Sequence, residues 1–348
     1  MKKIIQNIIE NYGLPRIIIF FFLSSLFVLA PFVGVRLDTS INDVIVRFGM
    51  NGLLVLSLVP MVKSGCGLNF GLQLGIIAGL LGAVTSIELE LIGFTGFFTA
   101  IGIAIFIAVI LGFLYGTLLN KIKGDEMVVA TYVGFSSVSF MCILWLILPF
   151  RSPNMIWAVG GSGLRTTIST QDYWFHVLTD FFKINIGSHI VFPTGNILFF
   201  ILLTFLVWAF FRTKMGTAMA AVGSNAYYAK SCGVNVNKMR IISVILSTVI
   251  AAIGIIVYQE SFGFIQLYMA PLYMAFPAIA ALLIGGASVR KVSIKNVIIG
   301  VFLFQGILTM TPSVVNNIIQ SDMSETIRII VSNGMIVYAL TRKIERER

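Results

Sequence analysis

Long runs of apolar residues dominate this chain and restrict the folds that it can adopt. Of its 348 residues, 58% are hydrophobic and 11% are charged, and the mean hydropathy is +0.97. A soluble domain carries about 25% charged residues, so this chain has too little polar surface to cover a water-exposed globule. A helix needs about 20 apolar residues to cross a bilayer. The sequence therefore predicts an integral membrane protein that crosses the bilayer several times.

The apolar runs predict an all-α bundle of about ten membrane-spanning helices, folded as a single domain over residues 1–348. The runs are too long and too rich in Phe, Ile and Leu for the alternating strands of a transmembrane barrel. Gly and Pro interrupt the last few runs, which favours tilted, broken or re-entrant helices there and leaves nine or eleven spans as alternatives. The predicted spans are 17–35, 44–62, 68–87, 98–119, 127–148, 196–211, 241–258, 273–289, 296–311 and 326–341.

Lys and Arg are distributed unevenly between the two sets of predicted loops. One set contains 18 of the 24 basic residues, and cytoplasmic loops are the ones that accumulate them. This bias places both termini and residues 212–240 in the cytoplasm, with 149–195 as the largest outer loop. Residues 1–16 would form a cytoplasmic or interfacial segment. The net charge of +10 then indicates anionic membrane lipid, not nucleic acid, as a partner.

The sequence lacks the motifs of a chain that powers or catalyses a reaction by itself. It contains no GxxxxGK[ST] loop, no HExxH motif and no His/Cys group with metal-ligand spacing. All 14 acidic residues fall in or beside predicted loops, whereas ion-coupled carriers keep ionisable groups at the membrane midplane. We therefore expect no bound cofactor, no metal and no catalytic site. Energy for transport would come from a partner. The alternatives are an ion-coupled secondary transporter and a non-transporting membrane scaffold or enzyme.

Glycine spacing predicts where helices approach one another closely. Gly71, Gly75 and Gly79 lie four residues apart, and Gly112 and Gly116 repeat the pattern further along. Small residues at this spacing form one helix face on which a neighbouring backbone can pack. We expect these faces to serve tight packing, with sliding of helices during transport as the alternative role.

A polar, glycine-punctuated segment, 212–240, separates two long apolar runs. Gly216 and Gly223 bracket a stretch rich in Ala and Met, and the Ser and Asn that follow can cap a helix. We expect that helix over 226–231, ended by Gly233 in the left-handed conformation. A short helix closed at both ends suits force transfer between subunits, and an ordinary connector is the alternative.

The spacing of this segment resembles the inner-membrane permeases of bacterial ABC importers, in the group that carries branched-chain amino acids, simple sugars and nucleosides. Stretches 64–84 and 277–308 are similar to two further motifs of that group and occur in its order. The chain departs from the pattern at Gln73, where family members often have Glu. The matching positions in the polar segment are Arg212, Gly216, Ala221, Gly223, Asn225, Ala229, Gly233, Val234, Asn235 and Val236.

The resemblance implies a permease subunit of the bacterial plasma membrane that works within a larger assembly. Two permease subunits, identical or different, would enclose the path, and separate ABC ATPase subunits would use the ATP. An extracytoplasmic substrate-binding protein would deliver the solute. The stretch 64–84 favours a nucleoside or simple sugar, with branched-chain amino acids, an autoinducer-like sugar or a vitamin still open. The residues implied in ATPase coupling are Gly216, Gly223, Asn225, Ala229 and Gly233.

Uncharged polar residues at membrane depth are the candidates for the substrate path. Amides and hydroxyls suit a neutral, hydroxyl-rich solute, and an interhelical hydrogen bond is the alternative role of each. Asn69 and Gln73, four residues apart, would share one helix face. In the outer loop, Arg151 and Arg165 are candidates for docking the binding protein, and a loop packed on itself is the alternative. The path candidates are Asn69, Gln73, Ser136 and Gln305.

Overall fold

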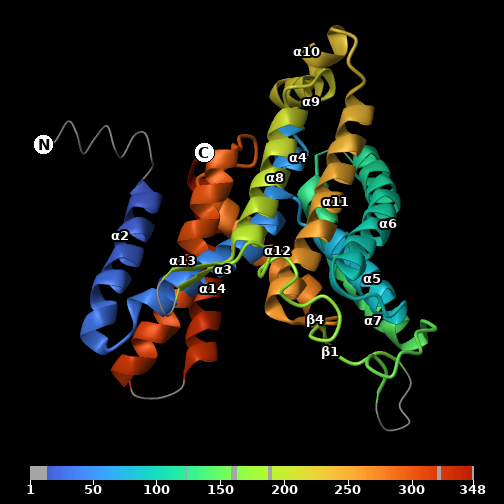
Figure 1. Cartoon of the computed structure of the whole chain (residues 1–348). Coiled ribbons are helices and arrows are strands. Elements are labelled where there is room, and N and C mark those ends of the chain that lie inside the picture. The colour runs from blue at the N-terminus through green and yellow to red at the C-terminus, as the bar shows by residue number, and fades with distance from the viewer. Residues whose placement is uncertain (1–13, 123, 158–162, 187–189, 320–322, 347–348) are drawn as a thin grey trace, which may run out of the picture.

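The chain folds into a bundle of long helices with two short helices projecting at one end (Figure 1). The structure, a computed structural model, describes residues 14–122, 124–157, 163–186, 190–319 and 323–346. The first half contains α2 (Leu14–Leu29), the 3-10 helix η1 (Ala30–Val33), α3 (Leu37–Leu56), α4 (Val59–Lys63), α5 (Gln73–Glu88), α6 (Gly93–Lys121) and α7 (Glu126–Ile147). The second half contains α8 (Thr194–Phe210), α9 (Lys214–Ser224), α10 (Ala226–Ser231), α11 (Val236–Phe262), α12 (Ala270–Ile284), α13 (Ile294–Ile319) and α14 (Ser324–Arg346).

The helical membrane bundle is confirmed, while the predicted number of spans is not. Six described helices, or seven if the bent pair α8 and α9 is counted as one span, are long and apolar enough to cross a membrane. The predicted spans 68–87, 273–289 and 326–341 fall on shorter apolar stretches of helix in α5, α12 and α14. Whether these cross the bilayer stays a prediction.

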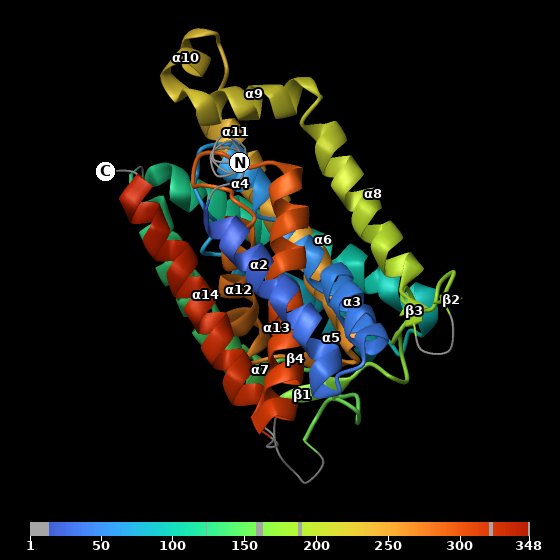
Figure 2. The same ribbon diagram turned by 90° about the vertical axis from the view of Figure 1, so that its left-hand side faces the viewer.

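The described ends of the chain, in α2 and α14, lie at the same end of the bundle as α9 and α10 (Figures 1 and 2). We call this the α9 end. The arrangement agrees with both termini lying on one side of the membrane. That this side is cytoplasmic rests on the Lys and Arg distribution and stays a prediction. Residues 1–13 of the predicted interfacial segment lie outside the described residues.

Four short strands within the described residues depart from the expected all-α fold. β1 (Thr167–Ser169) pairs antiparallel with β4 (Phe264–Gln266), which joins the long loop after α7 to the connection between α11 and α12. β2 (Ile184–Ile186) pairs with β3 (Ile190–Phe192) ahead of α8. Strands of three residues are too short to leave a period-two pattern, so sequence reasoning could not detect them.

The core of the bundle forms where α11 packs against α5 and α6. A Cβ on Gly75 would lie 2.6 Å from the Cβ of Ala251 and 2.7 Å from the carbonyl oxygen of Thr248. A Cβ on Gly112 of α6 would lie 2.9 Å from the Cα of Ile245. The helix backbones approach closely only because these positions lack side chains, so the glycine spacings do serve tight packing.

Candidate functional site

The segment predicted to couple to an ATPase, 212–240, forms two short helices at the α9 end. α8 ends at Phe210, and the axis of α9 is bent by 75° from that of α8. α9 therefore lies across the end of the bundle, and α10 follows at its tip (Figure 2). Thr213 caps α9, because its hydroxyl accepts a hydrogen bond from the Gly216 N–H at 3.3 Å.

Gly216 and Gly223, which flank the stretch rich in Ala and Met, both lie inside α9. A Cβ on Gly216 would overlap the carbonyl oxygen of Phe210, and one on Gly223 would overlap that of Lys63. Close packing therefore outweighs the cost of about 1 kcal/mol that glycine carries inside a helix. Gly216 thus lets α9 turn sharply from the end of α8, and Gly223 lets α9 pack against the end of α4.

α10 has the bounds that the sequence predicts. The Oδ1 of Asn225 accepts a hydrogen bond from the Tyr228 N–H at 3.0 Å and caps the first turn. Gly233 has a φ of 83°, which L-residues with side chains rarely adopt. Beyond it, the Val234 N–H donates to the carbonyl of Ala229 at 3.0 Å, the 6→1 bond of a Schellman motif. The six-residue helix is therefore closed at both ends.

An apolar cluster fixes α9 and α10 to the start of α11. Its buried members are Met219, Val222, Ala229 and Met239. On the solvent side, Tyr227 is 89% exposed and Tyr228 is 69% exposed. We call α9, α10 and this cluster the α9–α10 module. It combines a fixed apolar base with two aromatic side chains that nothing in the described chain covers.

The five residues implied in coupling all lie within or directly beside the α9–α10 module and divide by orientation. Gly216 and Ala229 are buried and Gly223 is half-buried, so these three face the bundle. Asn225 and Gly233 are exposed at the two ends of α10. The residue pattern of the permease family thus marks positions that shape the module. The exposed Tyr227 and Tyr228 were not among the predicted residues.

Asn69 belongs to a hydrogen-bond network in the interior of the bundle. The residue precedes α5, so the prediction that Asn69 and Gln73 share one helix face is wrong. Its Nδ2 donates to the Oγ of Ser247 at 2.9 Å, and its Oδ1 accepts from the Tyr115 hydroxyl at 3.1 Å. A helix cannot continue here because Gly65, at φ 78°, turns the chain after α4. Asn69 thus joins this turn to α6 and α11.

Gln73 is fully buried at the start of α5. Within the described residues, neither its Nε2 nor its Oε1 has a hydrogen-bond partner. The amide lies against α7, where a Cβ on Gly134 would be 2.9 Å from the Cδ of Gln73. A buried amide without partners costs about 1–3 kcal/mol of stability.

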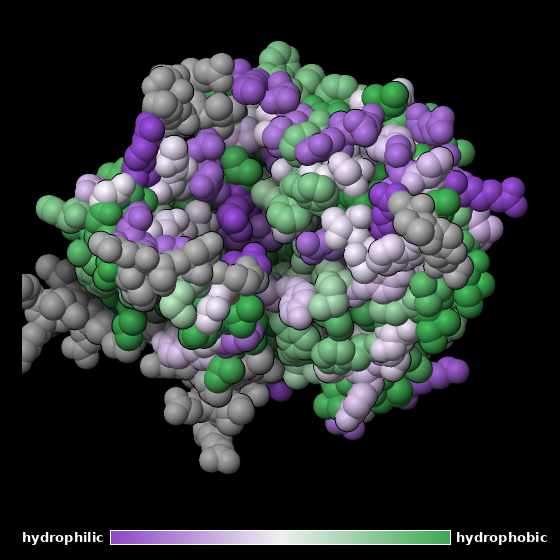
Figure 3. Space-filling view, turned by 90° about the horizontal axis from the view of Figure 1, so that it is seen from below, coloured by the Kyte–Doolittle hydropathy of each residue, from purple (hydrophilic) through white to green (hydrophobic). Residues whose placement is uncertain are grey.

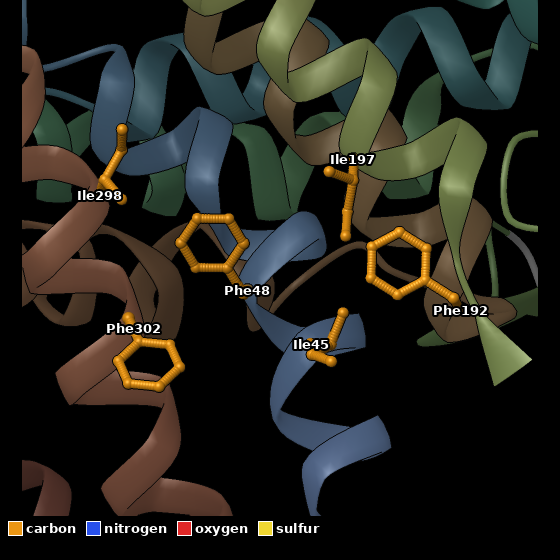
Figure 4. A pocket seen from close by; sticks show the side chains of 6 residues that line it. All are labelled: Ile45, Phe48, Phe192, Ile197, Ile298 and Phe302. Atoms are coloured by element: carbon orange, nitrogen blue, oxygen red, sulfur yellow. The ribbon is translucent and has the colours of Figure 1, made fainter. Parts of the chain in front are cut away.

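Ser136 is exposed on the outside of α7, and Gln305 is buried on α13. None of the four path candidates lines the pocket described next. A pocket of about 230 Å³ lies instead between α3, β3, α8 and α13 and has only apolar walls (Figure 4). Such a groove suits a lipid chain better than a polar solute. Its lining residues are Ile45, Phe48, Phe192, Ile197, Ile298 and Phe302.

Two carboxylates hold the loop that covers the opposite end of the bundle. Glu260, in the last turn of α11, accepts hydrogen bonds from the Leu178 and Thr179 N–H groups at 2.9 and 3.0 Å. Glu88, which ends α5, accepts from the Arg151 N–H at 3.0 Å. Viewed from this end, hydrophilic residues lie at the centre and at parts of the margin, interspersed with hydrophobic ones (Figure 3). These hydrogen bonds tie Arg151, Leu178 and Thr179 of the loop to the ends of α5 and α11.

The two predicted docking arginines differ in what their side chains do. Arg165 donates from Nε to the carbonyl of Ile156 at 2.6 Å, so its guanidinium helps to fold the loop. Arg151 is exposed. In the same loop, burial lowers the pKa of His176 below its usual value, although the nearby Asp180 carboxylate opposes the shift. Burial thus favours the neutral form of the ring.

Sequence reasoning missed an ion pair close to the α9–α10 module. Arg240, near the start of α11, pairs with Glu126 at the start of α7, and both side chains are largely buried. The two residues are 114 positions apart, so local patterns could not pair them. Among the described residues, no group of three or more His, Cys, Asp or Glu side chains could hold a metal ion.

These features define a multi-pass membrane protein with a structured module at one end of its helix bundle. Residues 40–340 match the family described as branched-chain amino acid transport system / permease component, and the chain belongs to that family. The resemblance carried by the polar segment and by stretches 64–84 and 277–308 is thereby confirmed. The chain is a permease-family protein of the inner membrane, as predicted.

The chain is also similar to several curated permeases. It is 26% identical over 226 residues to the nucleoside ABC transporter permease NupB of Lactococcus lactis, covering 61% of this chain and 57% of that protein. The autoinducer 2 import permease LsrC of Escherichia coli O9:H4 is 27% identical, covering 59% and 61%. The galactofuranose transporter permease YtfT of Escherichia coli K12 is 25% identical, covering 79% and 72%. The match thus spans less than two thirds of the first two relatives, and no solved structure matches the chain.

Proposed function

We propose that this chain is the permease subunit of an ATP-binding-cassette importer and that separate ATPase subunits dock on the α9–α10 module. The observation that carries the proposal is the exposed pair Tyr227 and Tyr228 on a helix that is closed at both ends. Exposed aromatic residues on a rigid base are typical anchors of protein interfaces. The apolar cluster beneath would pass a displacement of α10 into the bundle.

The energetic requirement of such coupling is modest. Reversing a two-state equilibrium from 1:99 to 99:1 takes about 5.5 kcal/mol of differential binding. A docked helix with two buried tyrosines, together with nucleotide-driven closure of the ATPases, suits this magnitude. This chain would hold no nucleotide itself and would perform no covalent chemistry.

We propose that the substrate path runs between two permease subunits, along the face formed by α7, α12 and α14. These three helices lie on one side of the bundle (Figure 2). Exposed polar side chains occur on each of them: Tyr132 and Ser136 on α7, Tyr273 on α12 and Asn333 on α14. Lipid disfavours an uncovered amide, so a second subunit or a water-filled path is the better environment for this face.

The solute that we propose is a nucleoside or a simple sugar. The relatives named above transport nucleosides, autoinducer 2 and galactofuranose according to their names. Hydroxyl and amide groups on the proposed face can hydrogen-bond a neutral solute of this kind. A branched-chain amino acid, the solute in the family's description, is the alternative within the same class.

We propose that a substrate-binding protein docks on the ordered loop at the opposite end, with Arg151 as one contact. The hydrogen bond from its backbone to Glu88 holds this residue while its side chain stays exposed. Replacing Arg151 with Glu should raise the concentration of binding protein needed for half-maximal uptake. Unchanged uptake kinetics would remove this part of the proposal.

The whole proposal is tested with the complete importer reconstituted in proteoliposomes. We expect ATP-driven uptake of a radiolabelled nucleoside or pentose that unlabelled competitors of the same class reduce and leucine does not. In a Tyr227→Ala/Tyr228→Ala variant, uptake and copurification of the ATPase should fall together. Phe106→Ala, which removes an exposed aromatic side chain from α6, is the matched control and should leave both unchanged.

Two outcomes would contradict the proposal. Uptake that persists without ATP and collapses with an ion gradient would indicate a secondary transporter. Retention of the ATPase and of uptake in the double tyrosine variant would remove the α9–α10 module as the docking surface.

A further inference from the structure

An irregular stretch of backbone, residues 64–72, interrupts the helices between α4 and α5. All but Gly65 and Phe70 in this stretch are buried. We call it the buried turn. Backbone without helical hydrogen bonds is tolerated at membrane depth only where protein or a water-filled cavity surrounds it. The contacts around this stretch therefore show which elements it connects.

The part of the buried turn nearest the α9 end supports α9. A Cβ on Gly65 would lie 3.1 Å from the Cα of Gly223, so the two backbones touch. The Lys63 side chain, just before the turn, places its Nζ 4.5 Å from the centre of the Phe211 ring. α9 thus rests directly on the turn and on the end of α4, without an intervening side chain at the point of closest approach.

Arg240 holds the sides of the buried turn to α11 and α7. Its Nε donates to the Sγ of Cys66 at 3.3 Å, and its guanidinium forms the ion pair with Glu126. A hydrogen bond of 2.7 Å between the Ser64 and Ser243 hydroxyls adds a second link to α11. One guanidinium therefore connects the turn with the first residue of α7.

The buried turn also contacts α7 directly, at Gly67. A Cβ on Gly67 would lie 3.2 Å from the Cγ of Met127, and the Gln73 amide that follows lies against Gly134. α7 itself is loosely embedded, since only 22% of its span is buried within the chain. A helix with so little packing of its own follows the elements to which it is tied.

We infer that the buried turn transmits movement of α9 to α7, with Arg240 as the positioning residue that keeps the turn and α7 together through Glu126. The inference rests on the proposed function. It adds to that function a defined route from the ATPase-docking module to the face proposed to line the path. Neither Arg240 nor Glu126 belongs to the exposed docking surface, so a change at either removes no side chain from that surface.

The test compares Arg240→Ala, Glu126→Gln and Arg240→Lys in the complete importer. In the first two, we expect ATP hydrolysis to continue while solute accumulated per ATP falls by about 2- to 30-fold, the range for residues in coupling networks. Arg240→Lys keeps a cation for Glu126 and should recover most of the loss. The matched control is Asn120→Ala, which removes a 2.9 Å bond from the end of α6 to the Asn237 carbonyl but leaves the turn untouched.

Hydrogen exchange separates this inference from the proposed function. In the isolated subunit, Glu126→Gln should increase exchange in residues 64–72 and in the first turns of α7, and Asn120→Ala should not. If wild type shows no ATP-driven uptake, the proposed function fails and exchange alone decides the inference. Unchanged exchange in Glu126→Gln, or a proportional fall of uptake and ATP hydrolysis, would overturn it. If Arg240→Ala cannot be recovered from membranes, the isosteric variant Glu126→Gln is used alone for both hydrogen exchange and solute accumulated per ATP.

Discussion

Two buried amides of the same residue class have opposite environments in this bundle. Asn69 is hydrogen-bonded to side chains of α6 and α11, whereas Gln73 has no partner among the described residues. The sequence presents both as polar residues at membrane depth and cannot separate them. The difference depends on which hydroxyls the fold brings within reach, and these lie on helices distant in the sequence.

Substitutions at these two residues should therefore differ in their effect on stability. Asn69→Ala leaves Ser247 and Tyr115 without their partner and should cost about 1–3 kcal/mol. Gln73→Met keeps the shape and removes an unpaired amide, so it should leave the unfolding temperature unchanged or raise it. Thermal unfolding in nanodiscs measures both. A loss of stability in Gln73→Met equal to that in Asn69→Ala would mean that the amide is paired in the membrane.

At the scale of elements, α9 and α10 are specified by different kinds of information. α10 has a local signature, because its Asn cap and its terminal glycine lie within nine residues of each other. The packing of α9 depends on a long-range contact, because only a glycine at position 223 leaves room for the carbonyl oxygen of Lys63. This explains why the sequence predicted the bounds of α10 and missed the helix that supports it.

The two glycines should accordingly respond differently to substitution. Gly223→Val inserts a branched side chain against the Lys63 carbonyl and should lift α9, so that ATP hydrolysis continues while uptake falls. At Gly233, where nothing lies within 4 Å, only backbone conformation is at issue. Gly233→Val should cost α10 about 1–2 kcal/mol, and Gly233→Asn less, because Asn tolerates the left-handed conformation.

The solute accumulated per ATP hydrolysed in proteoliposomes measures the first effect, and hydrogen exchange of the α10 amides measures the second. Gly233→Asn is the matched control for Gly233→Val, since both fill the same open space. If Gly223→Val accumulates as much solute per ATP as wild type, coupling does not need the close contact of α9 with the end of α4.

At the scale of the whole molecule, the orientation in the membrane can be tested with a native thiol. Cys232 is exposed at the end of α10, whereas Cys66 is buried and Cys142 lies within α7. An impermeant maleimide should therefore label inside-out vesicles and leave right-side-out vesicles unlabelled, as the Lys and Arg bias predicts. Cys232→Ser should abolish the signal. Labelling of right-side-out vesicles would place the α9 end on the outer face.

Membrane class, helical content and the capped helix α10 follow from the sequence by itself, because hydropathy, basic-residue bias and capping act over one or two dozen neighbouring residues. The exposed residues of the α7, α12 and α14 face follow from assembly of the bundle. The small strands, the contact of α9 with Gly65 and the ion pair of Arg240 with Glu126 also depend on that assembly. In each of these, partners come from segments far apart in the chain, and the close packing of helices decides which residues meet.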